Sequence, residues 1–291
     1  MRTKGIFLKS MIVFATAGML FTGCRREDED NDTSSASDNA FAEASFNDIT
    51  AIADQASYGS VNTYRTASGD QNSLLSACAT VTHDSANASD VDSITINFGT
   101  TNCQCLDGRY RRGIIRITYA GGNRYRDSGL VATITPVNYF VNDNGIAGTK
   151  TIENKGHITA GKLTWVISVN GTITLANGGG TVTWNSNRTK VLLAGETTYG
   201  GPINWSVAKW QLTGSANGTA ANGENFTAQI DNDNPLVRDM TCNLNRRHIV
   251  AGKMDFTPGN RPTRHIDFGT GTCDDLATVT INNNTYTIHM R

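Results

Sequence analysis

Residues 138–153 read NYFVNDNGIAGTKTIE, and they set the class of fold that we expect for the whole chain. Strand-forming segments flank Asn142-Asp143-Asn144-Gly145, and an Asn-Gly pair tolerates the positive φ that a tight hairpin requires. Strands joined by so short a turn pair antiparallel. This stretch therefore predicts a β-hairpin.

The same pattern of strand and turn continues on both sides of this hairpin. Residues 162–169 alternate, with Leu163, Trp165 and Ile167 on one face. Asn170-Gly171 is expected to punctuate the strands that follow, and three asparagines near the C-terminus predict another hairpin. No helix recurs between the strands, which argues against a parallel α/β fold. We expect an all-β fold of antiparallel strands and hairpins, arranged as a sandwich, a curved sheet or an open barrel.

One segment, residues 38–57, has the periodicity of a helix, with Ser37 or Asp38 as its cap. Its apolar residues form a single stripe at helical spacing: Ala42, Phe46, Ile49 and Ala53. We expect this short N-terminal helix to pack against a sheet.

The composition agrees with a β protein and excludes several other classes. Of 291 residues, 38 are Thr, 29 are Asn and 29 are Gly, which is about a third of the chain. Thr favours strands, whereas Asn and Gly favour turns. The formal net charge of −1 argues against a basic nucleic-acid binder. The sequence contains at most one long apolar run, which excludes a multi-span membrane protein.

The N-terminus has the pattern of an export signal. A basic segment, residues 2–9, precedes an apolar run, residues 11–21, that is too short to span a bilayer. The run ends in Thr22-Gly23-Cys24. This ending resembles a bacterial lipoprotein signal, in which the cysteine becomes a lipidated N-terminus. The resemblance implies that residues 1–23 are removed and that Cys24 carries several acyl chains, palmitate among them, which hold the protein at a membrane.

A tether follows this cysteine. Residues 25–32 read RREDEDND and residues 33–37 are small and mostly polar, so residues 24–37 cannot bury apolar surface. Acidic residues soon after the lipidated cysteine resemble the export signal of Bacteroidetes-type surface lipoproteins. The resemblance implies attachment to the outer membrane on its extracellular face. A plain spacer is the other interpretation of the same residues.

Two octapeptides in the remaining body, residues 38–291, repeat one another. Residues 96–103, INFGTTNC, and residues 266–273, IDFGTGTC, agree at five of eight positions, and each is preceded by a further cysteine. We interpret the body as two related β modules, or as one β domain built from a duplicated edge.

The cysteines of the body are Cys78, Cys103, Cys105, Cys242 and Cys273. Export to an oxidising compartment favours disulfides among them. The repeat suggests Cys242 with Cys273, and Cys78 with Cys103 or Cys105. We choose Cys103, which leaves Cys105 as the odd thiol. A zinc site of these first three cysteines with His83 is the alternative, although its spacing matches no standard zinc pattern.

The sequence contains few signals of chemistry. It has no nucleophile elbow, no zinc-peptidase motif and no phosphate-binding loop, so no catalytic residue is assigned. Arg109, Arg111 and Arg112 form a candidate binding face for acidic or glycan ligands, and a solvated hairpin face is the alternative. Asp231 and Asp233 form a candidate calcium loop, although it lacks the glycine and the distant glutamate of an EF-hand.

We therefore expect a lipid-anchored envelope protein, exposed at the surface, with a structural role or one in binding a glycan or protein ligand. No nucleic-acid partner is expected. The alternatives are an extracellular hydrolase acting on glycans or other exterior polymers and a periplasm-facing assembly factor. Paired carboxylates or a Ser–His contact in a cleft would favour the hydrolase, whereas an exposed aromatic groove without clustered titratable groups would favour binding.

Overall fold

A computed structural model describes residues 33–57, 79–84, 91–120, 127–199, 201, 203–242 and 249–289. The signal peptide, Cys24, most of the tether and Cys78 lie outside these residues. The elements are α1 (Ser34–Ser57), β1 (Thr80–Asp84), β2 (Val91–Asn97), β3 (Cys103–Gln104), β4 (Tyr110–Ala120), β5 (Val131–Val141), β6 (Asn144–Thr159), β7 (Lys162–Thr174), η1 (Ala176–Gly178), β8 (Thr181–Ala194), η2 (Trp205–Val207), β9 (Lys209–Thr219), β10 (Asn225–Ile230), β11 (Leu236–Asp239), β12 (Ile249–Pro258), β13 (Arg264–Thr270), β14 (Leu276–Ile281) and β15 (Asn284–His289).

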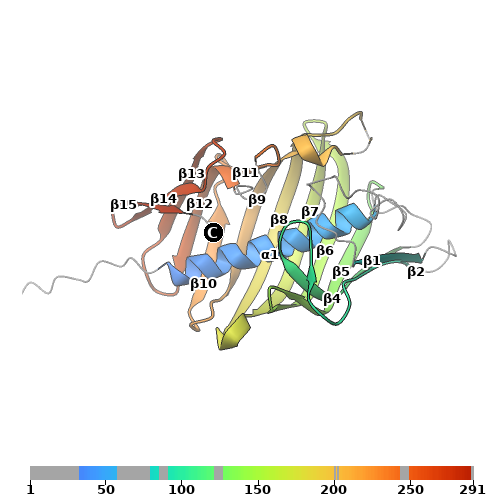
Figure 1. Cartoon of the computed structure of the whole chain (residues 1–291). Coiled ribbons are helices and arrows are strands. Elements are labelled where there is room, and N and C mark those ends of the chain that lie inside the picture. The colour runs from blue at the N-terminus through green and yellow to red at the C-terminus, as the bar shows by residue number, and fades with distance from the viewer. Residues whose placement is uncertain are drawn as a thin grey trace, which may run out of the picture. The chain divides into compact units, whose positions relative to one another are not determined.

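The described strands form one antiparallel sheet (Figure 1). Their order is β1-β2-β4-β5-β6-β7-β8-β9-β10-β12-β13-β14-β15, while β3 pairs with β4 and β11 pairs with β9 and β12. Most neighbours in the sheet are also neighbours in the sequence, because short turns join them. The predicted all-β, antiparallel class is confirmed. The strands do not divide into the two packed sheets of a sandwich.

The central hairpin forms, but its turn lies two residues before the predicted Asn-Gly pair. Asn142 and Asp143 make the turn between β5 and β6 with positive φ of 47° and 64°. Asn and Asp tolerate this conformation because their short side chains can hydrogen-bond locally. Gly145 lies within β6 instead. The predicted C-terminal hairpin turns in the same way, at Asn282 and Asn283.

Asn170 and Gly171 do not interrupt the strands, contrary to the prediction, because both lie inside β7. Gly171 makes room for the ring of Phe46, because a Cβ built on it would lie 2.1 Å from Cζ of Phe46. Without that Cβ, the ring of Phe46 reaches the sheet and stacks on Trp184, with ring centroids 5.6 Å apart.

The outer face of the sheet is polar. One row in register across β4 to β10 consists of Thr118, Thr133, Thr151, Ser168, Asn187, Ser215 and Gln229. None of these side chains is buried. Antiparallel sheets commonly keep one face in water. Part of the Thr and Asn excess of the sequence therefore lies on a solvated sheet face.

The inner face is covered by α1, which lies across the strands (Figure 1). The predicted apolar stripe is confirmed, since its four residues are at most 1% exposed. The helix begins at Ser34, however, so the end of the predicted tether is helical. The added turn docks on the loop between β9 and β10: Ser35 donates to Glu224, and Asn222 donates to Ser34.

Polar contacts fasten the helix to the sheet at intervals along its length. They are Trp184 Nε1 to Asn39 at 2.9 Å, Arg188 to Glu43 at 2.9 and 3.2 Å, Lys150 Nζ to the carbonyl of Phe46 at 2.8 Å, and Arg111 to Asp48 at 2.8 Å. Buried ion pairs add little net free energy after desolvation, but removing one partner is costly. These contacts therefore fix the position of the helix more than they stabilise the fold.

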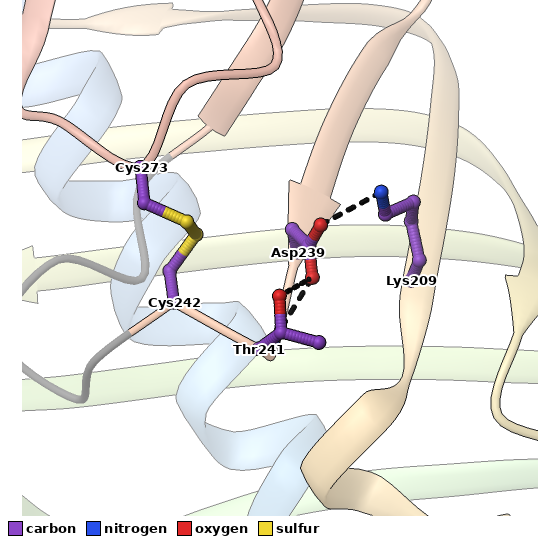
Figure 2. Close-up of a disulfide and its surroundings, with 5 residues drawn as sticks. All are labelled: Lys209, Asp239, Thr241, Cys242 and Cys273. Carbon is purple, nitrogen blue, oxygen red and sulfur yellow. Dashed lines mark hydrogen bonds and ion pairs between the residues drawn. A yellow bond between two sulfur atoms is a disulfide. The ribbon is translucent and has the colours of Figure 1, made fainter.

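The predicted disulfide between Cys242 and Cys273 is confirmed (Figure 2). It joins the turn after β11 to the loop between β13 and β14. Beside it, Asp239 accepts a hydrogen bond from the Thr241 hydroxyl at 2.7 Å and pairs with Nζ of Lys209 at 2.7 Å. The bridge and this small network hold the end of β11 in place.

The other described cysteines lie on and next to β3. Cys103 is disulfide-bonded, which removes it from the alternative zinc site, and its predicted partner Cys78 lies outside the described residues. Cys105 keeps a buried thiol, whose Sγ lies 3.7 Å from the carbonyl oxygen of Cys103.

The two repeated octapeptides form the same turn in one sheet. Gly99 and Gly269 both have φ of 82°, and each donates its N–H at 2.8 Å to the side chain two residues earlier, Asn97 or Asp267. The first copy begins in the last residues of β2 and the second begins in β13 and runs past its end, near the two ends of the strand order. The repeat thus has a structural meaning as a shared way of ending a strand.

The contact between Gly171 and Phe46 can be tested by Gly171→Ala. We expect the free energy of unfolding to fall by about 1–3 kcal/mol, the usual effect of overpacking a core. The new methyl group would meet a ring that Trp184 prevents from retreating. Urea unfolding measures the change. Gly171→Ala should lower the free energy of unfolding less in a Phe46→Leu background than in the wild type. An equal loss in both backgrounds would contradict the assigned contact.

Lys150 makes the stability depend on pH. Burial, together with repulsion from Lys190, lowers the pKa of Lys150 from 10.5 to about 7. Between these values the unfolded chain binds a proton that the folded chain lacks, so the free energy of unfolding rises with pH. In Lys150→Met we expect this slope to flatten by at most about 1.4 kcal/mol per pH unit, measured by urea unfolding between about pH 7.5 and 9.5. The exposed Lys155→Met is the matched control, and an unchanged slope in Lys150→Met would refute the assignment.

Candidate functional site

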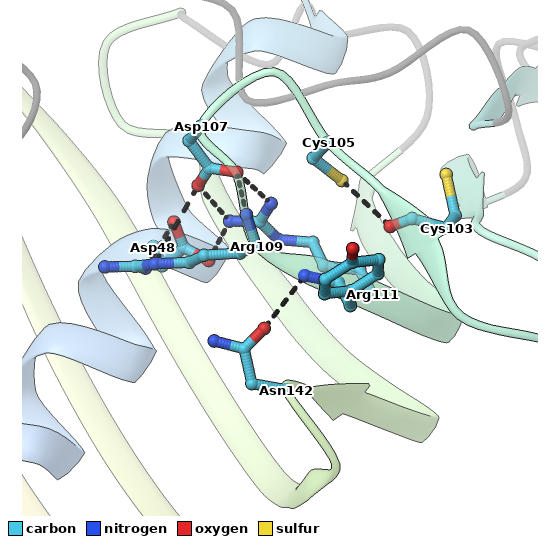
Figure 3. A network of polar contacts seen from close by, with 8 residues as sticks. Asp48, Cys103, Cys105, Asp107, Arg109, Arg111 and Asn142 are labelled. Atoms are coloured by element: carbon cyan, nitrogen blue, oxygen red, sulfur yellow. Dashed lines mark hydrogen bonds and ion pairs between the residues drawn. The ribbon is translucent and has the colours of Figure 1, made fainter.

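The predicted arginines lie before β4 and at its start, where Arg111 is buried (Figure 3). Its guanidinium donates to Asp107 at 2.7 and 2.8 Å and to Asp48 of α1 at 2.8 Å. Although burial opposes the charge, these two carboxylates raise the pKa of Arg111 above its ordinary value. Arg111 is therefore an interior cation that ties β4 to the helix.

The other two arginines also face carboxylates. Arg109 is 45% exposed and lies 3.4 Å from Asp48. Arg112 pairs with Asp143, donates to Asn102 at 2.7 Å, and lies over the ring of Phe140, 4.0 Å from its centroid. The three residues meet in one region, but the chain itself supplies their anionic partners. This arrangement favours a structural role, and ligand binding by these arginines stays a prediction.

The candidate calcium loop forms a hydrogen-bonded turn. Asp231 Oδ1 accepts from the backbone N–H of Asp233 at 2.8 Å and of Asn234 at 3.3 Å, and Oδ2 accepts from the Asn234 side chain at 3.1 Å. These hydrogen bonds, first that of the Asn234 side chain, lower the pKa of Asp231. Within the described ranges, no three His, Cys, Asp or Glu side chains come together as a metal site.

A cavity of about 250 Å³ lies beside the last turns of α1. Its apolar lining residues are Leu130, Ala132, Ile152, Leu163, Trp165 and Ile203. Its polar lining residues include Asp54, Asp127, Ser128, Asn154, His157 and Glu196. Apolar walls with a few converging polar groups are typical of ligand sites.

A stack of His157 and Tyr199 stands in the wall of this cavity. The imidazole Nε2 of His157 lies 2.9 and 3.0 Å from the two carboxylate oxygens of Glu196. The ring of Tyr199 stacks on the imidazole, with centroids 4.0 Å apart and planes 26° apart. Glu196 also forms a β-bridge with Ile203, which closes the segment that carries Tyr199. The imidazole is thus held from both sides.

The position of His157 depends on irregularities in the pairing of β6 with β7. The register shifts on both sides of Gly156 and His157, and Gly156 has φ of 71°. Asn154 accepts the N–H of Gly156 at 2.9 Å, and a Cβ on Gly156 would lie 2.5 Å from Oγ of Ser128. Such bulges re-aim side chains at the ends of strands. The glycine allows Ser128 and His157 to share one cavity.

The cavity shares lining residues with a second void of about 10 Å³, the size of about one water. Asp54 and Trp165 line both spaces, and Lys190 lines the smaller one. The Lys190 ammonium lies 3.6 Å from the centroid of Trp210, whose ring meets Trp165 edge-on at 5.3 Å. Desolvation lowers the pKa of Lys190 to about 8, against the opposing effect of Asp54.

These groups can hold a polar ligand, and the imidazole with its carboxylate has the form of a general base. Ser128 lies in the same cavity, but within the described part of the chain no hydrogen bond joins it to His157. The cavity therefore has titratable groups in a cleft beside one exposed aromatic ring, and it is not the aromatic groove without titratable groups that would favour binding alone.

No direct signal in the sequence pointed to this site. His157 and Glu196 are 39 residues apart, and they meet only because β6, β7 and β8 are adjacent in the sheet. The available signal was weak: Trp165 on a patterned strand, and Gly156 directly before a histidine. The bulge that aims the histidine cannot be inferred from strand periodicity.

Among the described helices, none has both the length and the apolar character needed to cross a membrane. Compared with protein-family models, curated proteins and solved structures, the chain matches none of them. A function has to be inferred from the residues of this chain themselves.

Proposed function

We propose that this protein is a lipid-anchored component of the bacterial cell envelope that binds a small ligand in the cavity beside α1. The cavity carries the proposal, since about 250 Å³ of space is lined by both apolar and polar side chains. The β-bridge between Glu196 and Ile203 and the paired strands β6 and β7 hold its walls. Because these walls are already held in place, binding a ligand costs little conformational entropy.

The N-terminal sequence supports the proposed location. The basic and apolar segments, Thr22-Gly23-Cys24 and the acidic residues after it have the order expected of a surface lipoprotein. The body would then stand in water on the extracellular side of the outer membrane. The polar outer face of the sheet is compatible with that surrounding.

The His157–Glu196 pair favours a second candidate, hydrolysis of the bound ligand. A carboxylate that orients an imidazole is a recurring element of general-base catalysis. Binding remains the first proposal because the chemistry of a hydrolase needs an activated nucleophile, and the contacts of His157 in the described residues are with Glu196 and Tyr199.

The anchor is tested by Cys24→Ala. We expect the protein to leave the membrane fraction, because each buried CH₂ of the lost acyl chains contributes about 0.8 kcal/mol to membrane attachment. Cell fractionation measures the change, and Cys105→Ala is the matched control. Protease added to intact cells should remove the wild-type body. Membrane retention of Cys24→Ala would refute the anchor, and full protection of the body would place it on the periplasmic side.

The cavity is tested with a library of sugars, amines and small acids and the full mature protein in detergent micelles. A ligand should raise the unfolding temperature, since it binds the folded state only. Glu196→Ala should weaken this effect about tenfold or more through loss of a hydrogen-bond acceptor and release of His157. Glu153→Ala is the control, because Glu153 pairs with Lys155 and is not among the residues that line the cavity. If ligands raise the unfolding temperature of Glu196→Ala as much as that of the wild type, the site is refuted. If the protein converts a bound ligand to product and this turnover requires Glu196, the second candidate is favoured.

A further inference from the structure

We propose that two copies of this chain pair through β15, so that their sheets join across a twofold axis into one antiparallel sheet. Among the described residues that line the cavity, none belongs to β14 or β15, so this inference is independent of the proposed binding function. It rests on the edge that β15 presents, on the backbone groups that point outward from it, and on the side chains that a second copy would meet.

The strand β15 lies at one end of the order of described strands, next to β14 (Figure 1). An edge strand offers a row of N–H and C=O groups to any further strand, and proteins usually block such an edge with Lys, Pro or a bulge. The sequence of β15, NTYTIH, contains neither Lys nor Pro. Its register with β14 runs from Leu276↔His289 to Ile281↔Asn284 without a shift. Within the described part of the chain, this edge is therefore regular and carries no blocking residue.

The turn before β15 decides which of its backbone groups point away from β14. Asn282 and Asn283 form a two-residue turn with positive φ of 48° and 68°. In such a hairpin the flanking residues, here Ile281 and Asn284, form a hydrogen-bonded pair, and pairs with and without hydrogen bonds then alternate. Every second residue from Asn284 onward therefore bonds to β14. The residues whose N–H and C=O point outward are Thr285, Thr287 and His289.

Antiparallel pairing of two identical strands about Thr287 uses all three of these outward-pointing residues. Thr287 of one copy then lies opposite Thr287 of the other, and Thr285 lies opposite His289. A register centred one residue away uses only two of the three, because the third would face the turn or the chain beyond β15. We therefore expect the register centred on Thr287. Because the same strand is used on both sides, the contact closes as a dimer.

The apolar side chains of β15 fit this register. Tyr286 and Ile288 lie opposite the buried Val279 and Ala277 of β14, and they are half-buried against the edge of the core. In the register centred on Thr287, Tyr286 of each copy lies opposite Ile288 of the other. An aromatic residue opposite a β-branched one is a favourable cross-strand pair. On the other face of the strand, threonine meets threonine or histidine, so no like charges are opposed.

The opposite end of the strand order, β1, is a poorer partner for β15. Val81 and His83 lie opposite the buried Ile96 and Ile94, so both are on the inner face of the sheet. Val81 is already buried in one copy, whereas His83 is exposed. This edge thus offers an imidazole where β15 offers Ile288. Pairing of β15 with β1 of a second copy would also be head-to-tail, which leads to a ring or an open chain of copies instead of a twofold dimer.

The test uses the full mature protein in detergent micelles, with a short bismaleimide crosslinker and non-reducing electrophoresis. Thr287→Cys should give a covalent dimer, because the two Cα atoms of a hydrogen-bonded pair lie about 5.5 Å apart. Thr285→Cys is the matched control on the same exposed edge. It lies opposite His289, so its two copies are about 14 Å apart, four residues at about 3.4 Å each, and they should crosslink far less. The wild type, whose remaining thiol Cys105 is buried, gives the background.

The second measurement is sedimentation velocity of Thr287→Pro. One shared strand is a small contact, so we expect a weak wild-type dimer, with Kd on the order of 0.1 mM. The proline removes an outward N–H but no hydrogen bond to β14, a position that an edge strand tolerates, and the variant should sediment as a monomer. Circular dichroism checks its fold, and if it unfolds, the two cysteine variants decide.

Three results would overturn the proposal. They are equal crosslinking of Thr287→Cys and Thr285→Cys, crosslinking of neither above the background, and a dimer that persists in a folded Thr287→Pro variant.

Discussion

The packing of α1 on the inner face of the sheet is the interaction on which the rest of the structure depends. Small side chains on the helix and Gly171 on β7 bring the two backbones close enough for Phe46 to reach Trp184. Ion pairs lie in the same interface, with Asp48 on Arg111 and Glu43 on Arg188. A shift of the helix by one turn would separate these buried charges, at a cost of several kcal/mol. Apolar burial supplies the free energy of the contact, and the ion pairs select one position for it.

The cavity follows from where this helix ends. α1 stops at Ser57, and Asp54 in its last turns is the residue that it contributes to the lining. Beyond that point the inner face near Trp165 is flanked by the segment that carries Glu196 and Tyr199. Among the described residues, Glu196, Tyr199, Gly201 and Ile203 of this segment complete the lining. Asp54 also interacts electrostatically with Lys150 and Lys190, and Lys190 lines the smaller void.

Periodicity was sufficient to predict the helix stripe and the strands, because both depend on the local spacing of apolar residues, and the short turns between strands predicted antiparallel pairing. Turn chemistry was less reliable. Asn142 and Asp143 make the turn that Asn144 and Gly145 were expected to make, since several residues in a row tolerate positive φ. Gly171 was misread as a turn residue because its role is set by Phe46, 125 positions earlier in the chain. The cavity was missed for a related reason: its residues converge through strand order and bulges.

The three arginines also show what could not be predicted from the sequence. Arg109, Arg111 and Arg112 suggested an acidic ligand, and the carboxylates that face them come from the chain itself, with Asp48 lying 63 residues before Arg111. The sequence shows which charge a side chain carries but not whether the fold already supplies its partner.

The cysteines bear on the location of the protein. Edge strands have one neighbour each, and the described cysteines that follow the repeated turn near the two ends of the sheet are both disulfide-bonded. A bridge across 31 residues contributes roughly 3–4 kcal/mol in the chain-entropy model. Because such bridges persist in oxidising compartments, the fold itself supports the proposed export.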